Sequence, residues 1–304
     1  MIAEISALVE RFAIRFERDA LKLRRANKIK TIYSSLAIEG NTLSETQVGD
    51  ILNGKNVVAP IRELQEVKNA IAVYDNFASF NPFSLEDLLR AHAQMMSALV
   101  ETAGQFRRSG VGVFDGDRAV HIAPPFERVP ELMANLFDWL KNTDDHLLIR
   151  SCVFHYEFEF IHPFADGNGR MGRLWQSLIL SKLNPVFQYL PVETLVHDNH
   201  LKYYEAINAS TANNDSGAFI DFMLGELLNA LKIHQGEPIG RVNGGVSGRV
   251  NEVFGYVKAH EGCNAGELSA ALSISKRTLA RDLKKLADQV EFRGAPKTGG
   301  YYLK

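Results

Sequence analysis

Few cysteines and no long hydrophobic run characterise this chain of 304 residues. Its two cysteines, Cys152 and Cys263, lie far apart in the sequence and outside any metal-ligand spacing, which excludes a disulfide framework and a zinc motif. No apolar run approaches the roughly 20 residues that a membrane-spanning helix needs. Residues 1–19 carry charges at helical spacing instead of a secretory signal sequence. We therefore expect a cytoplasmic protein with no membrane partner.

The chain also lacks a strong net charge, but its charges are unevenly distributed. The formal net charge is −2, yet residues 241–304 hold 11 Lys or Arg against 6 Asp or Glu, and the preceding residues hold 23 against 30. The change in sign coincides with a Gly-rich stretch at 234–248, which is typical of a linker. We predict a large domain over 1–235, a linker over 236–247 and a small basic domain over 248–304.

Helical periodicity dominates the large domain. Apolar residues recur at three- and four-residue intervals in residues 61–77, 85–99, 128–142 and 169–183. Ser44 and Ser84, each with a polar residue three positions later, have the spacing of helix N-caps. The exception is 106–125, in which β-prone runs flank Asp115-Gly116 and predict a hairpin. The fold class is therefore mainly α, with one small β-hairpin.

Residues 162–173, HPFADGNGRMGR, gather a histidine, a carboxylate, glycines and two arginines in a loop and the helix that follows. The glycines and the asparagine between them can direct backbone N–H groups inward, and the helix N-terminus adds its positive end, so an anion site is predicted. Arg170 and Arg173 lie one turn apart and suit phosphate oxygens. Asp166 beside phosphates suits Mg²⁺, and His162 can exchange a proton near neutral pH. Together these residues predict transfer of a phosphorus-centred group to a hydroxyl.

This stretch is similar to the Fic family pattern HxFx[DE]GNGRxxR at every specified position. The matching residues are His162, Phe164, Asp166, Gly167, Asn168, Gly169, Arg170 and Arg173. The resemblance extends over residues 1 to 232 and implies a helical Fic-type domain with a hairpin flap. It also implies transfer of AMP from ATP to a Ser, Thr or Tyr hydroxyl of a target protein, or of the chain itself. The family contains members that move other groups or remove AMP, and these alternatives stay open.

The resemblance assigns a role to each residue of the motif. His162 is the base that deprotonates the attacking hydroxyl, and Asp166 is the metal ligand that holds Mg²⁺ against the α- and β-phosphates. The other nucleotide-binding residues implied here are Phe164, Ala165, Gly167, Asn168, Gly169, Arg170 and Arg173. Among these, the arginines are expected on the outer phosphates, whereas Phe164 is expected to pack the loop onto the core.

A second similarity lies near the N-terminus, at the end of a helix expected over about 28–40. The sequence SSLAIEG resembles the inhibitory pattern [ST]xxxE[GN] of the family. The resemblance implies that Glu39 reaches Arg173 and excludes the γ-phosphate of the nucleotide from its productive position. The alternative is an ordinary solvated Glu at a helix end, because three matched positions are a weak signal by themselves. We predict autoinhibition within one chain.

Two further nucleotide contacts follow from the resemblance. Val120, His121 and Ile122 would belong to the flap that aligns the target by strand addition and covers the nucleotide, although His121 has an equal alternative as an exposed loop residue. Tyr203 and Tyr204 match a family Tyr pair on the adenosine side. Because adjacent helix residues point about 100° apart, one member of this pair is expected to be in the core.

The basic domain resembles a winged helix-turn-helix. Helical segments at 250–260, 265–274 and 275–288 precede a predicted hairpin at 290–303, and Ser275 is placed as the N-cap of the third helix. The basic residues expected on the recognition helix and the wing are Lys276, Arg277, Arg281, Lys284, Arg293 and Lys297. Such modules bind DNA or dock proteins, and the sequence leaves both partners open, together with a homodimer.

Two function classes remain. One is a protein adenylyltransferase whose C-terminal domain selects or localises targets. The other is a DNA-binding transcriptional regulator in which the nucleotide pocket is only a sensor. Intact His162 and Asp166 favour the enzyme, because a sensor needs a phosphate loop but no base. The expected donor substrate is ATP, and the expected cofactor is Mg²⁺.

Overall fold

A computed structural model of the chain describes residues 1–18, 20–115, 118–190, 192–236, 253–254, 256–258, 260–272, 276–286, 290–294 and 299–303. The chain divides into two compact units, Met1–Gly240 and Arg241–Lys304. Hydrophobic clusters fill the first unit, and a separate small cluster fills the second. The predicted linker, 236–247, lies outside the described residues except for its first residue.

All regular elements described in the first part of the larger unit are helices. Its elements are α1 (Ile2–Arg18), α2 (Ala20–Ile38), α3 (Glu45–Leu52), α4 (Ile61–Asp75), the short 3-10 helix η1 (Phe77–Ser79) and α5 (Leu85–Met95). Both predicted helix starts are confirmed: Ser44 caps α3 in a reciprocal contact with Gln47, and the Ser84 side chain accepts the Asp87 N–H at the start of α5. These caps satisfy backbone donors that a helix N-terminus leaves without partners.

The second part of the larger unit begins with the hairpin. Its elements are β1 (Gly112–Asp115), β2 (Arg118–Ile122), η2 (Phe126–Arg128), α6 (Val129–Asn142), α7 (Leu147–Ile161), α8 (Asn168–Ser181), η3 (Pro185–Gln188), α9 (Val192–Asp198), α10 (His200–Asn213) and α11 (Gly217–Gly236). The strands are antiparallel, with Gly112 opposite Ile122 and Val113 opposite His121, and the register shifts after Val113. The predicted hairpin is therefore present, while its turn at 116–117 lies outside the described residues.

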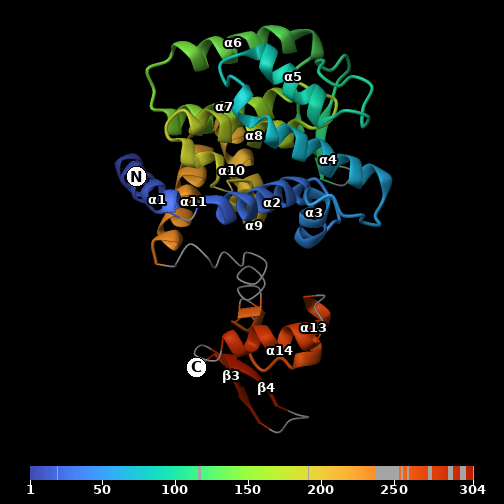
Figure 1. Ribbon diagram of the computed structural model, residues 1–304, viewed down its shortest axis with the longest axis vertical. Helices are drawn as coiled ribbons and strands as arrows, with labels where there is room; N and C mark the ends of the chain where they lie inside the picture. The colour runs from blue at the N-terminus through green and yellow to red at the C-terminus, as the bar shows by residue number, and fades with distance from the viewer. Residues whose placement is uncertain are drawn as a thin grey trace. The chain divides into compact units, whose positions relative to one another are not determined.

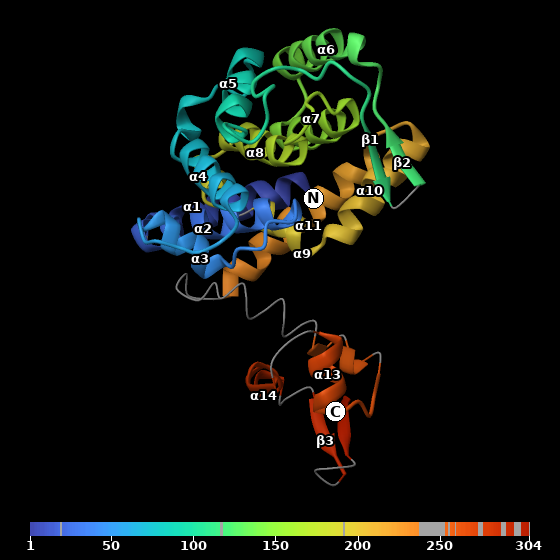
Figure 2. The ribbon, with the colours of Figure 1, turned by 90° about the vertical axis from the view of Figure 1, so that its right-hand side faces the viewer.

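Helices α7 and α8 form the centre of this unit. They pack against each other, with α5 and α6 on one side and with α2, α9, α10 and α11 on the other (Figure 1). The hairpin stands at the side of the unit away from α3 and α4 (Figure 2). Helix α8 is buried almost all round, including polar residues such as Asn168, Arg170 and Gln176. The loop between α7 and α8 is therefore anchored at both ends in the core. Across the described ranges, no helix combines the length and the apolarity needed to cross a membrane.

The smaller unit contains α13 (Ala265–Ala271), α14 (Lys276–Lys285), β3 (Val290–Arg293) and β4 (Gly300–Leu303). The strands are antiparallel, with Val290 opposite Leu303. Of the predicted helix at 250–260, residues 253–254 and 256–258 are helical. Ser275 and Lys297 lie outside the described residues, as do the side chains of Lys276 and Arg277. Two helices followed by a hairpin agree with a winged helix-turn-helix, which stays a prediction.

Candidate active site

His162 ends α7 in a strained backbone conformation. Its φ of 51° and ψ of 61° lie in the left-handed region, which costs a non-glycine residue about 1 to 3 kcal/mol. Its N–H donates to Phe158 O at 2.9 Å, and its carbonyl oxygen accepts from Arg107 Nε at 2.8 Å. These contacts hold the residue in place. The imidazole, which is 22% exposed, lies at the edge of the loop.

Arg107 joins the end of α7, the loop and the base of the hairpin. It is 3% exposed. Its Nη2 donates to Pro124 O at 2.5 Å and to Ile161 O at 3.3 Å, and its backbone N–H donates to Pro163 O at 2.9 Å. This residue is not among those predicted from the sequence. Its only signal is a position just before the hairpin, which the exposed neighbour Arg108 shares.

The loop itself is closed by buried polar contacts. Asn168 Oδ1 accepts the Phe164 N–H at 2.8 Å, and Asn168 Nδ2 donates to Phe164 O at 2.9 Å. The Phe164 ring is fully buried and stacks on His92, with ring centroids 3.6 Å apart. His92 Nδ1 accepts the Gly104 N–H at 2.8 Å, so Nε2 carries the hydrogen and donates to Asp166 O at 3.0 Å. Burial lowers the pKa of His92 to about 4, which keeps the required neutral form at pH 7.

The start of α8, residues 167–173 and here called the cradle, has the features of an anion site. Gly167 is its N-cap with a φ of 88°, and a Cβ there would lie 2.7 Å from Met96 Sδ, so only glycine fits. The first N–H groups of the helix point to the loop, as at other helix N-termini. Arg170 Nε and Arg173 Nε are buried and have no hydrogen-bond partner in the described part of the chain. Buried donors of this kind fit phosphate oxygens.

Asp166 lies beside this cradle between two arginines. Its carboxylate contacts Arg170 Nη2 at 3.0 Å and Arg62 Nη2 from α4 at 3.1 Å. Arg170 also lies 3.8 Å from Glu66. The Asp166 side chain is 37% exposed, and a carboxylate next to bound phosphates is the ligand that Mg²⁺ prefers. The residues therefore fit such an ion, whereas no sequence signal identified Arg62.

Glu39 contacts Arg173 from the end of α2. Glu39 Oε1 lies 2.7 Å from Arg173 Nη2, which also donates to Ser35 O at 3.0 Å. Burial alone would lower the pKa of Arg173, but the Glu39 carboxylate raises it above its ordinary value. A Cβ on Gly169 would collide with the Glu39 carboxylate, so the acidic group lies directly against the first turn of α8. The two side chains paired by the resemblance are therefore in contact.

The remaining predicted site residues differ in their surroundings. Tyr203 is 3% exposed, and its hydroxyl lies 3.1 Å from His155 Nε2, whereas Tyr204 is 46% exposed. Tyr203 is thus the core member of the pair, and Tyr204 is left as the candidate for adenosine contact. Residues 120–122 lie in β2, but their side chains are outside the description.

Comparisons with known proteins identify the family. A profile of the Fic/DOC family matches residues 82–180. The crystal structure of a Fic family protein from Desulfovibrio desulfuricans is 40% identical, has a TM-score of 0.75, and aligns over 100% of this chain and 94% of that chain. The chain belongs to the Fic family. The resemblance of the 162–173 motif and the helical Fic fold are therefore confirmed.

Curated Fic relatives are longer than this chain. A "Protein adenylyltransferase Fic" from Culex quinquefasciatus is 33% identical over 68% of the chain and 44% of that protein. Another from Nematostella vectensis is 29% identical over 67% of the chain and 48% of that protein. The chain thus spans less than half the length of these two relatives.

Proposed function

We propose that this Fic chain transfers AMP from ATP to a Ser, Thr or Tyr hydroxyl of a protein, either a separate target or the chain itself. The observation that carries the proposal is the position of His162 at the edge of a loop whose cradle holds the buried donors Arg170 Nε and Arg173 Nε. A phosphate sensor needs the cradle but no titratable group beside it. The names of the curated relatives support the same activity.

In the proposed reaction, His162 takes the proton of the attacking hydroxyl, whose oxygen forms a bond to the α-phosphorus. The bond from the α-phosphorus to the bridging oxygen breaks, and pyrophosphate leaves. The protein contributes mainly positioning and charge stabilisation, as in other phosphoryl-type transfers. The start of α8, with Arg170 and Arg173, binds the phosphates. Asp166 would hold Mg²⁺, which neutralises phosphate charge when bound.

We also propose that Glu39 inhibits this reaction within the chain. Its carboxylate lies 2.7 Å from Arg173 Nη2 and against Gly169, where it would oppose an outer phosphate. A carboxylate and a phosphate repel each other at such distances, so a nucleotide bound beside Glu39 would place its γ-phosphate elsewhere. The α-phosphorus would then lie out of line with the attacking hydroxyl.

Donor labelling tests the proposed function. The Glu39→Gly chain, given Mg²⁺ and ATP labelled at the α-phosphate, should form covalently labelled protein, and mass spectrometry should show AMP on a hydroxyl. ATP labelled at the γ-phosphate should give none. Adding His162→Ala should abolish the label. Incorporation from the γ-position would overturn AMP transfer in favour of phosphoryl transfer. If the nucleotide binds but no label forms, both AMP transfer and phosphoryl transfer would be overturned.

Removal of AMP is a second candidate, because a carboxylate beside the cradle can also orient a water molecule. The side chain of Glu39 is 30% exposed at this position. Protein labelled by the Glu39→Gly chain would be purified and incubated with the unaltered chain. Release of AMP that depends on Glu39 would favour removal, whereas a stable label would leave transfer as the function.

A further inference from the structure

A second carboxylate lies behind His162. Glu159 lies in the last turn of α7, three residues before His162. Glu159 Oε2 lies 4.0 Å from His162 Nδ1, and Glu159 Oε1 lies 3.8 Å from His155 Nε2. The Glu159 side chain is 13% exposed. Its Oε1 atom has no hydrogen-bond partner among the residues that the structure describes.

We propose that Glu159 is a positioning residue for His162. It accepts the Nδ1 hydrogen of the imidazole and leaves Nε2 to take the proton of the attacking hydroxyl. The proposal rests on the base role proposed for His162. A small side-chain rotation converts 4.0 Å into a hydrogen bond, and such bonds are often long before substrate binds. A carboxylate at one ring nitrogen selects one tautomer and stabilises the imidazolium that forms.

The neighbouring histidine cannot serve Glu159 as a donor. His155 Nδ1 lies 2.7 Å from Gln176 Oε1, and His155 Nε2 lies 3.1 Å from the Tyr203 hydroxyl. Burial lowers the pKa of His155 to about 3, so the ring is neutral and has one hydrogen. That hydrogen is donated to Gln176, and Nε2 accepts from Tyr203. Of the two histidines, His162 is therefore the one whose Nδ1 can donate to Glu159.

The other groups around Glu159 hold it in place and set its charge. A Cβ on Gly172 would lie 2.7 Å from Glu159 Oε1, so the backbone of α8 packs directly against the carboxylate. Burial raises the pKa of Glu159 to about 7, Arg173 from α8 favours its ionised form, and Glu39 from α2 disfavours it. The carboxylate therefore exchanges its proton near neutral pH.

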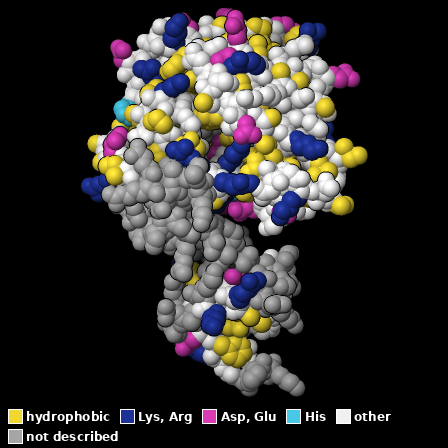
Figure 3. Space-filling view, in the orientation of Figure 1, with side chains coloured by type: hydrophobic (Ala, Val, Ile, Leu, Met, Phe, Trp, Pro, Cys, Tyr) yellow, Lys and Arg dark blue, Asp and Glu magenta, His cyan; other side chains and the backbone are white. Residues whose placement is uncertain are grey.

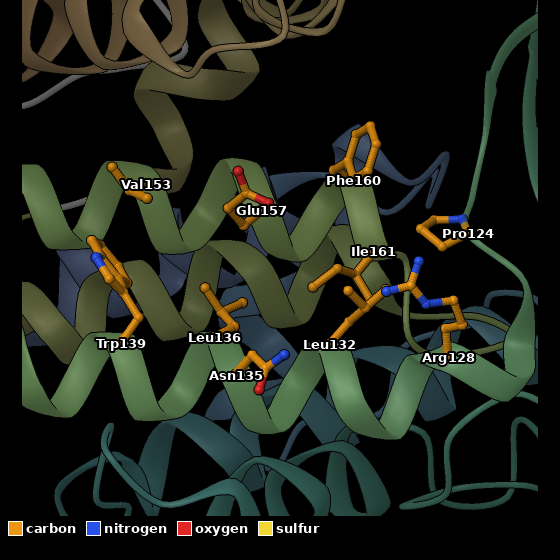
Figure 4. A pocket seen from close by; sticks show the side chains of 10 residues that line it. All are labelled: Pro124, Arg128, Leu132, Asn135, Leu136, Trp139, Val153, Glu157, Phe160 and Ile161. Atoms are coloured by element: carbon orange, nitrogen blue, oxygen red, sulfur yellow. The ribbon is translucent and has the colours of Figure 1, made fainter.

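Glu157 provides a matched control on the same helix. It lies two positions before Glu159, which places its side chain about 200° around the helix axis. Figure 4 shows Glu157 among the side chains that line a groove of about 440 Å³ between α6 and α7, together with Trp139 and Phe160. Burial raises the pKa of Glu157 as well. The two glutamates thus share charge and partial burial, but only Glu159 faces His162.

Nitrogen NMR of the full chain with labelled histidine tests the contact without relying on activity. The His162 signal is identified by its loss in His162→Ala. In the unaltered chain we expect the Nδ1–H tautomer. Glu159→Gln should give a mixture of tautomers and a lower His162 pKa, because the neighbouring negative charge is removed, whereas Glu157→Gln should change neither. An unchanged tautomer and pKa in Glu159→Gln would overturn the proposal.

Kinetics in the Glu39→Gly background supply a second readout. Glu159→Gln should lower kcat roughly 10- to 1000-fold, leave the KM for ATP nearly unchanged, and move the acidic limb of the kcat profile to lower pH. Glu159→Asp, which keeps the charge, should recover part of the rate. Equal changes in kcat and KM without a pH shift would indicate a structural role instead. If the Glu39→Gly chain is not labelled but the NMR results agree with the contact between Glu159 and His162, the proposed function is contradicted and the positioning role of Glu159 is not.

Discussion

The loop between α7 and α8 and the contact between Glu39 and Arg173 are held in different ways. The loop is fixed by buried polar groups from separate segments, among them Arg107, His92 and Asn168. Glu39, in contrast, reaches Arg173 through one side-chain ion pair and is 30% exposed. Leaving a buried polar group without a partner costs about 1 to 3 kcal/mol. This cost applies once at the Glu39–Arg173 pair, in which Arg173 is 2% exposed, but several times at the loop. The loop is therefore held by several contacts, whereas the contact proposed to inhibit the reaction can be broken by removing one side chain.

The largest expected effect comes from removing the base while leaving the loop intact. In the Glu39→Gly background, His162→Ala should lower labelling by about 10³-fold, because the hydroxyl then loses its proton acceptor. ATP affinity, measured by calorimetry, should be nearly unchanged, since the cradle lies in α8. Parallel loss of binding and labelling would show that His162 holds the nucleotide instead.

The second-largest effect should come from breaking the contacts by which Arg107 supports the loop. Arg107→Lys keeps the charge but loses the forked donors to Ile161 and Pro124, so the free energy of unfolding should fall by about 2 to 4 kcal/mol. Labelling should decrease as well. Arg108→Lys, at the exposed neighbouring position, is the control and should change neither quantity. Urea unfolding measures the free energy of unfolding, and the labelling rate measures the activity. Similar losses in the two variants would contradict the role of Arg107.

Loss of the contact proposed to be inhibitory should raise activity and lower stability only moderately. Glu39→Gly should raise labelling roughly 5- to 150-fold, the range typical of coupling between two sites. Its free energy of unfolding should fall by about 1 to 3 kcal/mol, because Arg173 is 2% exposed and loses one partner while keeping Ser35 O. Glu39→Gln, which keeps the size and removes the charge, should activate less. A large loss of stability would mean that Glu39 is part of the scaffold.

Acid should weaken the loop because it protonates His92, which is buried on α5 and contacts Phe164 and Asp166. The pKa of His92 is lowered by burial from 6.5 to about 4, so its stabilisation is present above pH 6.5 and is lost as the pH falls toward 4. One such group changes the free energy of unfolding by about 1.4 kcal/mol per pH unit within this window. His92→Gln should therefore have a shallower slope between pH 6.5 and 4 in urea unfolding. If the slope of the His92→Gln chain equals that of the unaltered chain, protonation of His92 does not contribute to the loss of stability in acid.

Buried carboxylates act in the opposite direction, so the comparison must be made between variant and unaltered chain. Burial raises the pKa of Glu159 and of Glu193 to about 7. Their contribution is fully present below about pH 4.5 and is lost as the pH rises through 7. Both the unaltered chain and the His92→Gln chain retain Glu159 and Glu193. The contributions of these two groups therefore cancel in the difference between the two slopes.

Sequence predicts local features of this molecule better than its tertiary contacts. The caps at Ser44 and Ser84 depend on neighbours three residues away, and the 162–173 motif contains its own loop and helix start, so both are visible in the sequence. Arg107 and Arg62 act on segments far along the chain, and nothing in their spacing distinguishes them from solvated arginines. Periodicity also could not tell which tyrosine is buried, because this depends on how α10 packs against α7.

The smallest effect on the site should come from the C-terminal unit. Figure 3 shows basic and hydrophobic side chains on the described surface of this unit. Arg281 and Lys284 are exposed on α14, and Arg293 is exposed on β3. If α14 binds DNA phosphates, changing both α14 residues to Ala should reduce the slope of log affinity against log salt by about 2, because each contact contributes about 0.9.

The same double variant separates the two partners that the sequence left open. Self-labelling in the Glu39→Gly background should be unchanged, because neither side chain belongs to the unit that contains His162. Weakened labelling of a separate target, with no salt-dependent DNA binding in a shift assay, would assign α14 to protein docking. A steep salt slope that falls in the variant would assign it to DNA. Loss of self-labelling would instead show that the C-terminal unit supports the loop between α7 and α8. The loop could then no longer be contrasted with the Glu39 contact as the part that is held independently.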